Sequence, residues 1–300
     1  MKQSTSKVFM VKPVSFTYNP QTANDNAFQK KGTENNTQEA ALREFVAFTS
    51  LLKANGIDVV VVNDTKLPFT PDSIFPNNWF STHEDGTLVL YPVCALNRRS
   101  ERKDDFFDGI RKNFKIRRTL DLTEWEEQEM YLESTGSMVF DRCNKIVYSC
   151  TSSRTHIGPL EAFCKQLCFT PVMFRALDRN GKEIYHTNVM MNIGSEIAVV
   201  CLESIEESSR EKVVNSLQET GKEIIEISFD QMENFAGNML ELTNNLGKKL
   251  LVMSATARLS LTAEQLKTIN KHYYRILSPQ LDTIEINGGG SARCMMAELF

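Results

Sequence analysis

Three residues far apart in the sequence carry the side chains that thiol-based catalysis requires. Cys294 follows the stretch "GGGSAR", His186 lies in "IYHTNVMM", and Glu133 lies in "YLESTGSMVF". A cysteine thiolate can attack a carbon centre, a histidine can carry a proton, and a carboxylate can orient the imidazole. Each also has a structural alternative: a buried free cysteine, a core histidine, and a carboxylate satisfied by a donor partner. The local sequence does not show that the three meet.

The spacing of five short polar clusters indicates an internal repeat. Each cluster precedes an apolar run, and the steps of 55, 53, 52 and 56 residues separate, in order, Asn78, Glu133, His186, Asn238 and Cys294. A near-constant period predicts repeated supersecondary units stacked around an axis. The five marker residues would meet at that axis.

Strand-like and helix-like segments alternate along the chain. β-rich runs bounded by polar or turn residues predict strands at 7–14, 57–64, 86–93, 145–150, 196–202, 248–254 and 274–279. Helical periodicity covers 37–56, 98–114, 158–169, 203–221 and 261–273. No Pro-, Gly- or Ser-rich linker divides them, so we expect one α/β domain over residues 1–300. The polar segment 17–40 is long enough for a lid or binding loop, with a disordered surface loop as the alternative.

The composition is that of an ordinary globular protein. Of 300 residues, 41% are hydrophobic and 24% charged, with a formal net charge of −4 and a pI near 5.7. This acidic balance argues against nucleic acid or an anionic membrane as the partner. No apolar run forms a signal peptide or approaches the roughly 18 residues of a membrane span. Seven irregularly spaced cysteines argue against a disulfide framework, and no second Cys or His pair has zinc-ligand spacing. We therefore expect a cytoplasmic protein without metal or cofactor.

Five motifs, in order along the chain, resemble those of a known enzyme superfamily. "GGGSARCM" resembles the end of arginine deiminases, where a glycine run and Arg precede the nucleophilic Cys-Met, and "YHTN" resembles their His-x-Asp element. "PDSIFPNN", "LESTGSMVFD" and "CTSSRTH" resemble segments of dimethylarginine dimethylaminohydrolases. From about Met10 to Phe300, the chain looks like the guanidine-modifying (pentein) superfamily, most closely its amidinotransferase-like or citrulline-utilisation hydrolase branch. The resemblance implies a single-domain, five-bladed α/β propeller of pseudo-fivefold symmetry.

The resemblance also implies roles for single residues. Cys294 would be the nucleophile, His186 the general acid/base, and Glu133 the residue that orients the imidazole. The glycines at 288–290 would expose backbone near the reacting carbon.

Three further matched residues would bind the substrate's amino-acid part. Arg98 and Arg154 match the arginines that hold the substrate carboxylate, a task that suits the guanidinium fork. For Arg98 the alternative is a solvated helix start, because "RRSERKDD" is a charge run. Asp72 matches an acid that would face the α-amino group.

Asparagines replace acids at three positions of the family pattern: Asn77, Asn78 and Asn188. A buried guanidinium flanked by amides lacks its counter-charges, whereas an amide offers a donor and an acceptor to a neutral ureido group. We therefore expect hydrolysis of citrulline to ornithine, CO₂ and ammonia through a covalent adduct on Cys294. The expected partner is a small amino-acid substrate, and a homo-oligomer is compatible with the sequence.

Two alternatives remain open. The first is another enzyme of the superfamily: an arginine deiminase or dihydrolase, or an amidinotransferase that passes the group to an amine. The second is a non-catalytic pentein that binds an amino acid or a protein. The intact set of Cys, His and Glu argues against the second alternative.

Overall fold

Small sheets of three strands organise the chain. The computed structural model describes residues 1–32 and 36–300, and within these ranges the strands form five such sheets. Residues 33–35, part of the predicted segment 17–40, lie outside the described residues. Four sheets follow one another along the chain: β3 (Phe80–Thr82), β4 (Thr87–Leu90) and β5 (Arg118–Asp121); β6 (Val139–Asp141), β7 (Ile146–Cys150) and β8 (Thr170–Phe174); β9 (Met191–Ile193), β10 (Ile197–Val200) and β11 (Glu223–Glu226); β12 (Leu240–Thr243), β13 (Lys249–Val252) and β14 (Arg275–Leu277). The remaining sheet joins distant parts of the sequence: β15 (Ala297–Leu299), β1 (Lys7–Lys12) and β2 (Asp58–Asn63).

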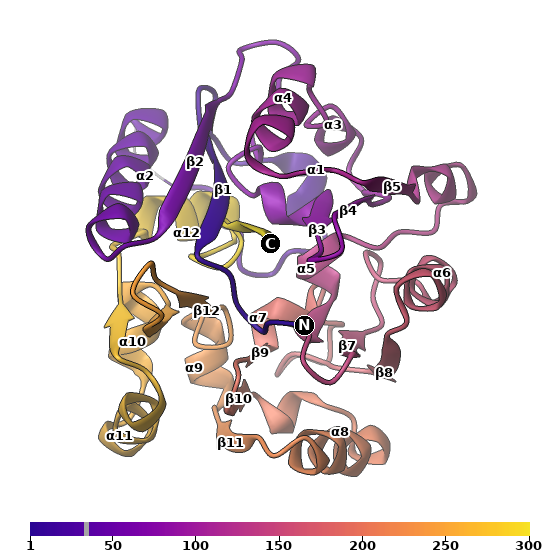
Figure 1. Ribbon diagram of the computed structural model, residues 1–300, viewed down its shortest axis with the longest axis vertical. Helices are drawn as coiled ribbons and strands as arrows, with labels where there is room; N and C mark the ends of the chain where they lie inside the picture. The colour runs from indigo at the N-terminus through magenta and orange to yellow at the C-terminus, as the bar shows by residue number, and fades with distance from the viewer. Residues whose placement is uncertain (33–35) are drawn as a thin grey trace.

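Each sheet repeats one pattern of pairing. The central strand pairs antiparallel with one neighbour and parallel with the other. A parallel pair needs a long crossover, which is usually helical. The crossovers here are α2 (Thr37–Ala54), α4 (Asp104–Asn113), α6 (Ile157–Leu167), α8 (Glu207–Glu219) and α11 (Ala263–His272). Figure 1 shows these helices around the rim of the molecule, with the short helices α5 (Ser134–Ser137) and α7 (Thr187–Met190) near its centre. The five sheets fit the pseudo-fivefold repeat.

The predicted marker residues occupy equivalent places in this repeat. Each lies shortly before the first strand of an antiparallel pair: Asn78 ends the 3₁₀ turn η1 (Pro76–Asn78), Glu133 and His186 immediately precede α5 and α7, and Asn238 and Cys294 lie just before β12 and β15. Because the segments before these strands converge on the centre, the repeat gathers polar side chains there.

The core explains why the longer elements were predictable. In α2, the side chains of Ala41, Phe45, Phe48 and Leu52 are buried at helical spacing. Residues Val8–Val11 of β1 and all four residues of β10 are fully buried, as expected for apolar runs covered on both faces. Burying one such large apolar side chain contributes roughly 1.5–3 kcal/mol.

One predicted helix was wrong in its extent. The segment 98–114 forms α3 (Leu96–Arg99) and α4, separated by a turn. In that turn, Glu101 accepts hydrogen bonds from the Arg98 guanidinium, at 2.8 Å from Nε and 3.0 Å from Nη2, and both side chains are buried. Lys103 is extended and begins α4. A buried ion pair therefore replaces the continuous solvated helix that the charge run suggested.

The strands β3, β5, β6, β8, β9, β11, β12 and β15 and the short helices α5 and α7 were not predicted. The same holds for α1 (Pro20–Ala23), η2 (Thr123–Gln128), η3 (Leu202–Ser204), α9 (Phe229–Glu233), α10 (Ala255–Ser260) and α12 (Asp282–Gly288). Across the described ranges, no helix combines the length and apolar character needed to cross a membrane.

Candidate active site

Cys294 and His186 line one small central cavity, and Glu133 lies directly beside His186. His186 Nε2 is 2.8 Å from Glu133 Oε2, and the backbone N–H of Cys94 donates to Glu133 Oε1 at 3.0 Å. All three predicted catalytic side chains are buried. The cavity measures about 20 Å³, which is room for about one water molecule.

The charges around Glu133 and His186 fix their protonation. Burial opposes ionisation of Glu133, but the Arg154 guanidinium and the hydrogen bond with His186 outweigh it and hold the pKa of this carboxyl far below its usual value. Burial lowers the pKa of His186, although Glu133 opposes the shift. An ionised carboxylate can only accept, so Nε2 carries the proton and Nδ1 keeps its lone pair. The imidazole is a neutral base at neutral pH.

Gly136 leaves the space that His186 needs. A Cβ at this glycine would lie 2.7 Å from His186 Nδ1 and 2.4 Å from Asn78 Nδ2. No side chain fits there, so glycine keeps the basic nitrogen and the Asn78 amide next to each other.

The Cys294 thiol contacts two amides. Asn188 Nδ2 lies 3.5 Å and Asn238 Nδ2 lies 3.3 Å from Cys294 Sγ. Sequence analysis singled out Asn238 only as a repeat marker. Asn188 does not line the catalytic cavity, and its amide contacts the Cys294 thiol; its contact with the substrate stays a prediction.

The segment around α1, which covers one side of the cavity and is called the cover below, supplies an ion-pair partner of Arg154. Arg154 Nε donates to Asp25 Oδ2 at 2.9 Å, Nη2 contacts the same carboxylate, and Nη2 also donates to the carbonyl of Thr22 at 2.9 Å. Arg154 Nη1 lies 3.5 Å from Glu133 Oε2. The guanidinium also lies over the Tyr185 ring, 4.9 Å from its centroid. Asp25, Thr22 and Tyr185 were not predicted.

On the other side, Arg98 is tied to residues of the ring itself. Besides Glu101, it donates from Nη1 to Asn78 Oδ1 at 2.7 Å and from Nη2 to the carbonyl of Phe75 at 3.0 Å. Burial opposes its charge, but the Glu101 pair raises the pKa of Arg98 above its usual value. The solvated helix start, considered as an alternative for Arg98, does not describe this buried side chain.

The two neighbouring asparagines differ in their surroundings. Asn78 lines the cavity, and its Nδ2 has no hydrogen-bond partner within the described part of the chain. Asn77 does not line it; its Nδ2 donates to Thr135 Oγ1 at 3.2 Å. The structure therefore separates Asn78, a candidate for substrate contact, from Asn77, a packing residue.

Asp72 lines the cavity and keeps one oxygen available. Its Oδ2 accepts from Asn19 Nδ2 at 2.7 Å and from Thr22 Oγ1 at 3.0 Å. Its Oδ1 is buried and has no partner among the residues described. Burial raises the pKa of Asp72, against the opposing charge of Arg98.

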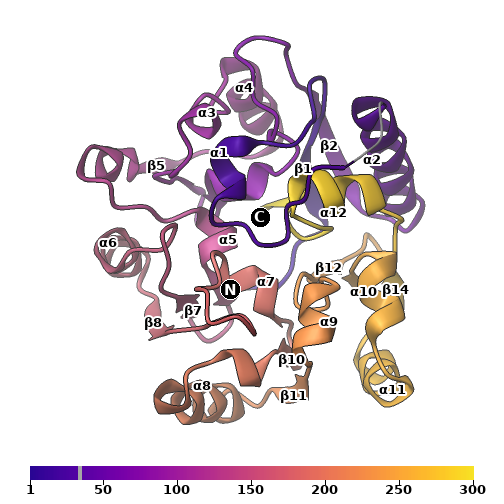
Figure 2. The same cartoon turned by 180° about the vertical axis from the view of Figure 1, so that it is seen from behind.

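The segment that includes α1 lies over the cavity. Figure 2 shows it crossing the centre of the molecule beside α12. Asn26 Nδ2 donates to the carbonyl of Gly289 at 3.2 Å, and Gln29 Nε2 donates to the carbonyl of Asn287 at 2.8 Å. Tyr185 Oη donates to the same Gly289 carbonyl at 2.8 Å. Gly289 has φ +61°, where a side chain would be strained. The glycine run thus anchors the cover.

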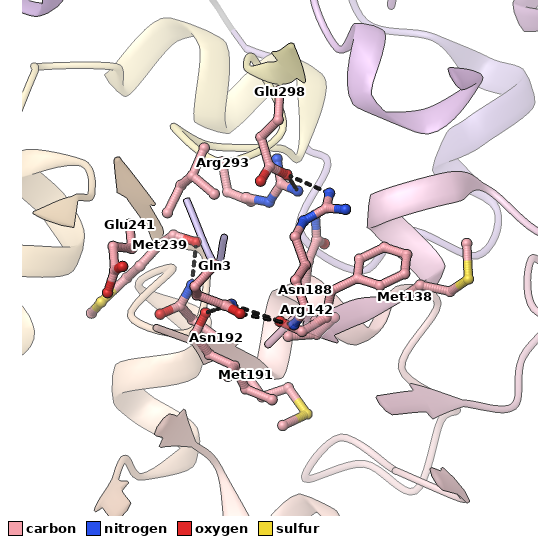
Figure 3. Close-up of a pocket in the computed structure, with 14 residues that line it drawn as sticks. Gln3, Met138, Arg142, Asn188, Met191, Asn192, Met239, Glu241, Arg293 and Glu298 are labelled. Atoms are coloured by element: carbon pink, nitrogen blue, oxygen red, sulfur yellow. Dashed lines mark hydrogen bonds and ion pairs between the residues drawn. The ribbon is translucent and has the colours of Figure 1, made fainter. Parts of the chain in front are cut away.

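A second cavity, of about 30 Å³, is lined by Asn188 and by Arg293, the residue before Cys294. Figure 3 shows Asn188, Arg142, Arg293 and Glu298 around it. Arg293 Nη2 donates to Glu298 Oε2 at 2.8 Å, and Arg142 Nη2 lies 3.5 Å from the same oxygen. These buried ion pairs hold Arg293, the residue next to Cys294.

Known structures share this fold. The N-terminal domain of ArgZ, an arginine dihydrolase from the ornithine-ammonia cycle in cyanobacteria, is 16% identical, with a TM-score of 0.77 over 98% of this chain and 97% of that one. AgrE in complex with L-arginine matches with 16% identity and a TM-score of 0.77, over 98% of this chain and 40% of that one. DDAH from Pseudomonas aeruginosa in complex with citrulline matches with 14% identity and a TM-score of 0.70, over all of both chains.

Two limits apply to these matches. The chain spans 40% of the length of full-length ArgZ. No curated protein sequence matches it. At these identities the structural matches establish the fold.

A family model and the fold together place the chain among the C–N hydrolases of the guanidine-modifying (pentein) superfamily, and the paired Glu133 and His186 beside a buried thiol fit an enzyme of this class. The family model is described as "N,N dimethylarginine dimethylhydrolase, eukaryotic" and matches residues 12–300. The chain belongs to this family.

Proposed function

We propose that the protein hydrolyses the ureido group of citrulline, with Cys294 as nucleophile, His186 as general acid/base and Glu133 as the residue that orients His186. The observation that carries the choice of a ureido group is the orientation of the Asn78 amide.

The hydrogen bond with Arg98 fixes the orientation of the Asn78 amide. Arg98 Nη1 can only donate, so the atom 2.7 Å from it must be the amide oxygen. The NH₂ group therefore faces the cavity, beside His186, without a protein partner in the described ranges. An NH₂ donor complements the carbonyl oxygen of a ureido group. It does not complement a guanidinium, which consists of donors only.

The chemistry follows from the neutral imidazole and the thiol. His186 Nδ1 accepts the proton of the Cys294 thiol, and the resulting thiolate attacks the ureido carbon while Asn78 donates to the developing oxyanion. The protonated His186 then transfers this proton to the departing nitrogen, and a C–N bond breaks. A water molecule, deprotonated by His186, then attacks the thiocarbamoyl carbon and releases Cys294. Loss of CO₂ from the carbamate balances citrulline and water against ornithine, CO₂ and ammonia.

Asp72 and Arg154 are the best-placed groups for the amino-acid end. The available Oδ1 of Asp72 can accept from an α-ammonium group. Arg154 can hold the α-carboxylate once Asp25 leaves it, because a second carboxylate would then replace the first. The closed cavity is too small for an amino acid, so we propose that the cover within 17–40 opens as a lid.

Arginine dihydrolysis is the second candidate. The similarity of fold to ArgZ and AgrE over 98% of this chain favours it. A dihydrolase must also process a ureido intermediate, so Asn78 fits its second step. An amidinotransferase would instead require an amine acceptor.

One assay separates these reactions. Purified protein is incubated separately with citrulline, arginine, agmatine and methylarginines, and ammonia and ornithine are quantified. We expect ornithine from citrulline at a higher kcat/KM than from arginine. Higher efficiency with arginine would favour the dihydrolase, and no turnover of any compound would favour the non-catalytic alternative. A cytoplasmic location and a homo-oligomer remain predictions, which cell fractionation and light scattering would test.

A further inference from the structure

A second amide beside the nucleophile has no role in the steps above. Asn238 is 1% exposed, and its Nδ2 lies 3.3 Å from Cys294 Sγ. We infer that Asn238, together with Asn188, stabilises the Cys294 thiolate by direct N–H donation to sulfur. Asn238 is then a catalytic residue, because its amide contacts the reacting sulfur. This inference rests on the proposed function in taking Cys294 as the nucleophile.

The orientation of the Asn238 amide is determined by its other contacts. The backbone N–H of Arg293 donates to Asn238 Oδ1 at 3.1 Å, so this atom must be the oxygen. Nδ2 also donates to the backbone carbonyl of Asn188 at 3.0 Å. These two backbone contacts leave the second N–H of Asn238 for the sulfur.

The backbone around Asn238 holds this position closely. A Cβ at Gly237 would lie 2.3 Å from the carbonyl oxygen of Val189 in α7. Phe235, three residues before Asn238, adopts a left-handed φ of +62°. The loop that carries Asn238 therefore packs directly on the helix that carries Asn188, and both amides contact the thiol.

The thiolate needs such donors because of its surroundings. Cys294 is 4% exposed, so little water reaches its sulfur. In the ranges that the structure describes, Cys294 Sγ hydrogen-bonds to amides and to no cationic side chain. His186 is neutral, so it does not provide the positive charge that accompanies many reactive cysteines. Hydrogen bonds to the charged form can replace that charge.

Asn238→Asp is the sharpest variant. It keeps the shape and the acceptor for Arg293 N–H, and it replaces the donor with a carboxylate that repels a thiolate. Asn238→Ala removes the donor without adding charge. Asn192→Ala is the matched control, because Asn192 is a buried asparagine whose Nδ2 donates to the carbonyl of Met239 at 2.7 Å and which does not contact Cys294.

The measurement is the pH dependence of Cys294 alkylation by iodoacetamide, followed by peptide mass spectrometry. The exposed Cys143 and Cys168 serve as internal references. We expect the midpoint for Cys294 to rise by about one pH unit in Asn238→Ala, with roughly tenfold slower alkylation at neutral pH. Asn238→Asp should shift it further, and Asn192→Ala should not shift it. Circular dichroism melts check that each variant folds.

Unchanged midpoints in folded Asn238→Asp and Asn238→Ala would overturn the inference. If both fail to fold, Asn188→Ala removes the other donor and must raise the midpoint for the two-amide arrangement to stand. Alkylation needs no substrate, so the result does not depend on which compound is hydrolysed. If the alkylation midpoint of Cys294 shifts in the variants but the protein turns over no citrulline, the proposed function is refuted and the inference about Asn238 stands.

Discussion

The two arginines that flank the cavity are neutralised in different ways. Arg98 pairs with Glu101, three residues away in the same turn, and the side chains of both are at most 3% exposed. Arg154 pairs with Asp25, 129 residues away in the covering segment, where the aspartate side chain is 26% exposed. Glu101 lies in the same turn as Arg98 and stays paired with it, whereas Asp25 lies in the covering segment and can move away from Arg154. We therefore expect that Arg98, predicted from the sequence to hold the carboxylate as well, instead orients Asn78, and that Arg154 binds the substrate carboxylate.

Cys294→Ser should give the largest effect. The comparison of Arg98 with Arg154 assumes that both arginines border a cavity in which Cys294 is the nucleophile. A serine hydroxyl is hardly ionised near neutral pH, so turnover should fall by at least about a hundredfold. Ammonia release measures turnover, with calorimetric substrate binding and a melting curve as controls. Residual activity above about a hundredth of wild type would count against covalent catalysis by Cys294.

Arg154→Ala should weaken binding of the substrate α-carboxylate. A charge-assisted contact contributes roughly 1.5–3 kcal/mol, so KM for citrulline should rise about ten- to a hundredfold. KM for a ureido analogue without the α-carboxylate should change much less. Steady-state kinetics on both compounds give the ratio.

Arg98→Ala is the matched variant for that experiment. Because Glu101 occupies its guanidinium, its KM ratio between the two compounds should stay near that of wild type. A larger ratio change in Arg98→Ala than in Arg154→Ala would reverse the assignment of the two arginines.

Asn78→Asp tests whether Asn78, which pairs with Arg98, selects a ureido group over a guanidinium. The carboxylate would accept from Arg98 as the amide does, but it would repel a ureido oxygen and attract a guanidinium. The arginine-to-citrulline ratio of kcat/KM should rise roughly tenfold, which corresponds to about 1.4 kcal/mol. Asn77→Asp, next to it but outside the cavity, should leave the ratio unchanged. A flat ratio in an active Asn78→Asp protein would remove the main support for citrulline.

Asp25→Asn gives the smallest expected effect. Substrate would no longer displace a charged partner from Arg154, so KM should fall about two- to fivefold, as expected for a partly exposed ion pair. Stability at neutral pH should fall modestly, by about 1 kcal/mol or less. Glu101→Gln, its counterpart on the other side, leaves a buried Arg98 charge poorly compensated and should destabilise by about 3–5 kcal/mol. Urea unfolding compares the two, and equal losses would contradict the distinction.

The same pair predicts a pH effect. Burial alone would raise the pKa of Asp25, but Arg154 and Ser153 lower it below its usual value. A carboxyl with a lowered folded pKa stabilises above its unfolded pKa of about 3.9, and this contribution is lost as the pH falls through the folded value. Between wild type and Asp25→Asn, the difference in unfolding free energy should therefore shrink below about pH 4. A constant difference down to pH 2 would contradict the pairing.

Sequence patterns predicted the long amphipathic helices, such as α2, and the apolar runs bounded by polar or turn residues, such as β10. The strands β5, β8, β11 and β12 carry polar residues within short segments and were not predicted. The strands β3, β6, β9 and β15 have three residues each and are buried throughout, so they show no alternation. They follow directly after the marker segments, where the motifs obscure any strand signal.

The site divides in the same way. Cys294, His186 and Glu133 could be found because each lies in a motif, and the structure places His186 against Glu133 and Cys294 in the same cavity as His186. Asp25 could not be assigned to Arg154, because nothing local encodes a contact across 129 residues. Asn238 carried a signal, its place in the repeat, but only the folded ring shows its distance to the sulfur.

The pairing of β15 with β1 has a consequence during protein synthesis. Lys7 pairs with Leu299 and Phe9 with Ala297, so this sheet cannot form until β15 has left the ribosome. Cys294 lies three residues before β15. A nascent chain can therefore have synthesised His186, Glu133 and both arginines and still lack Cys294. We expect the thiol to enter the site in the step in which β15 pairs with β1 and closes the ring.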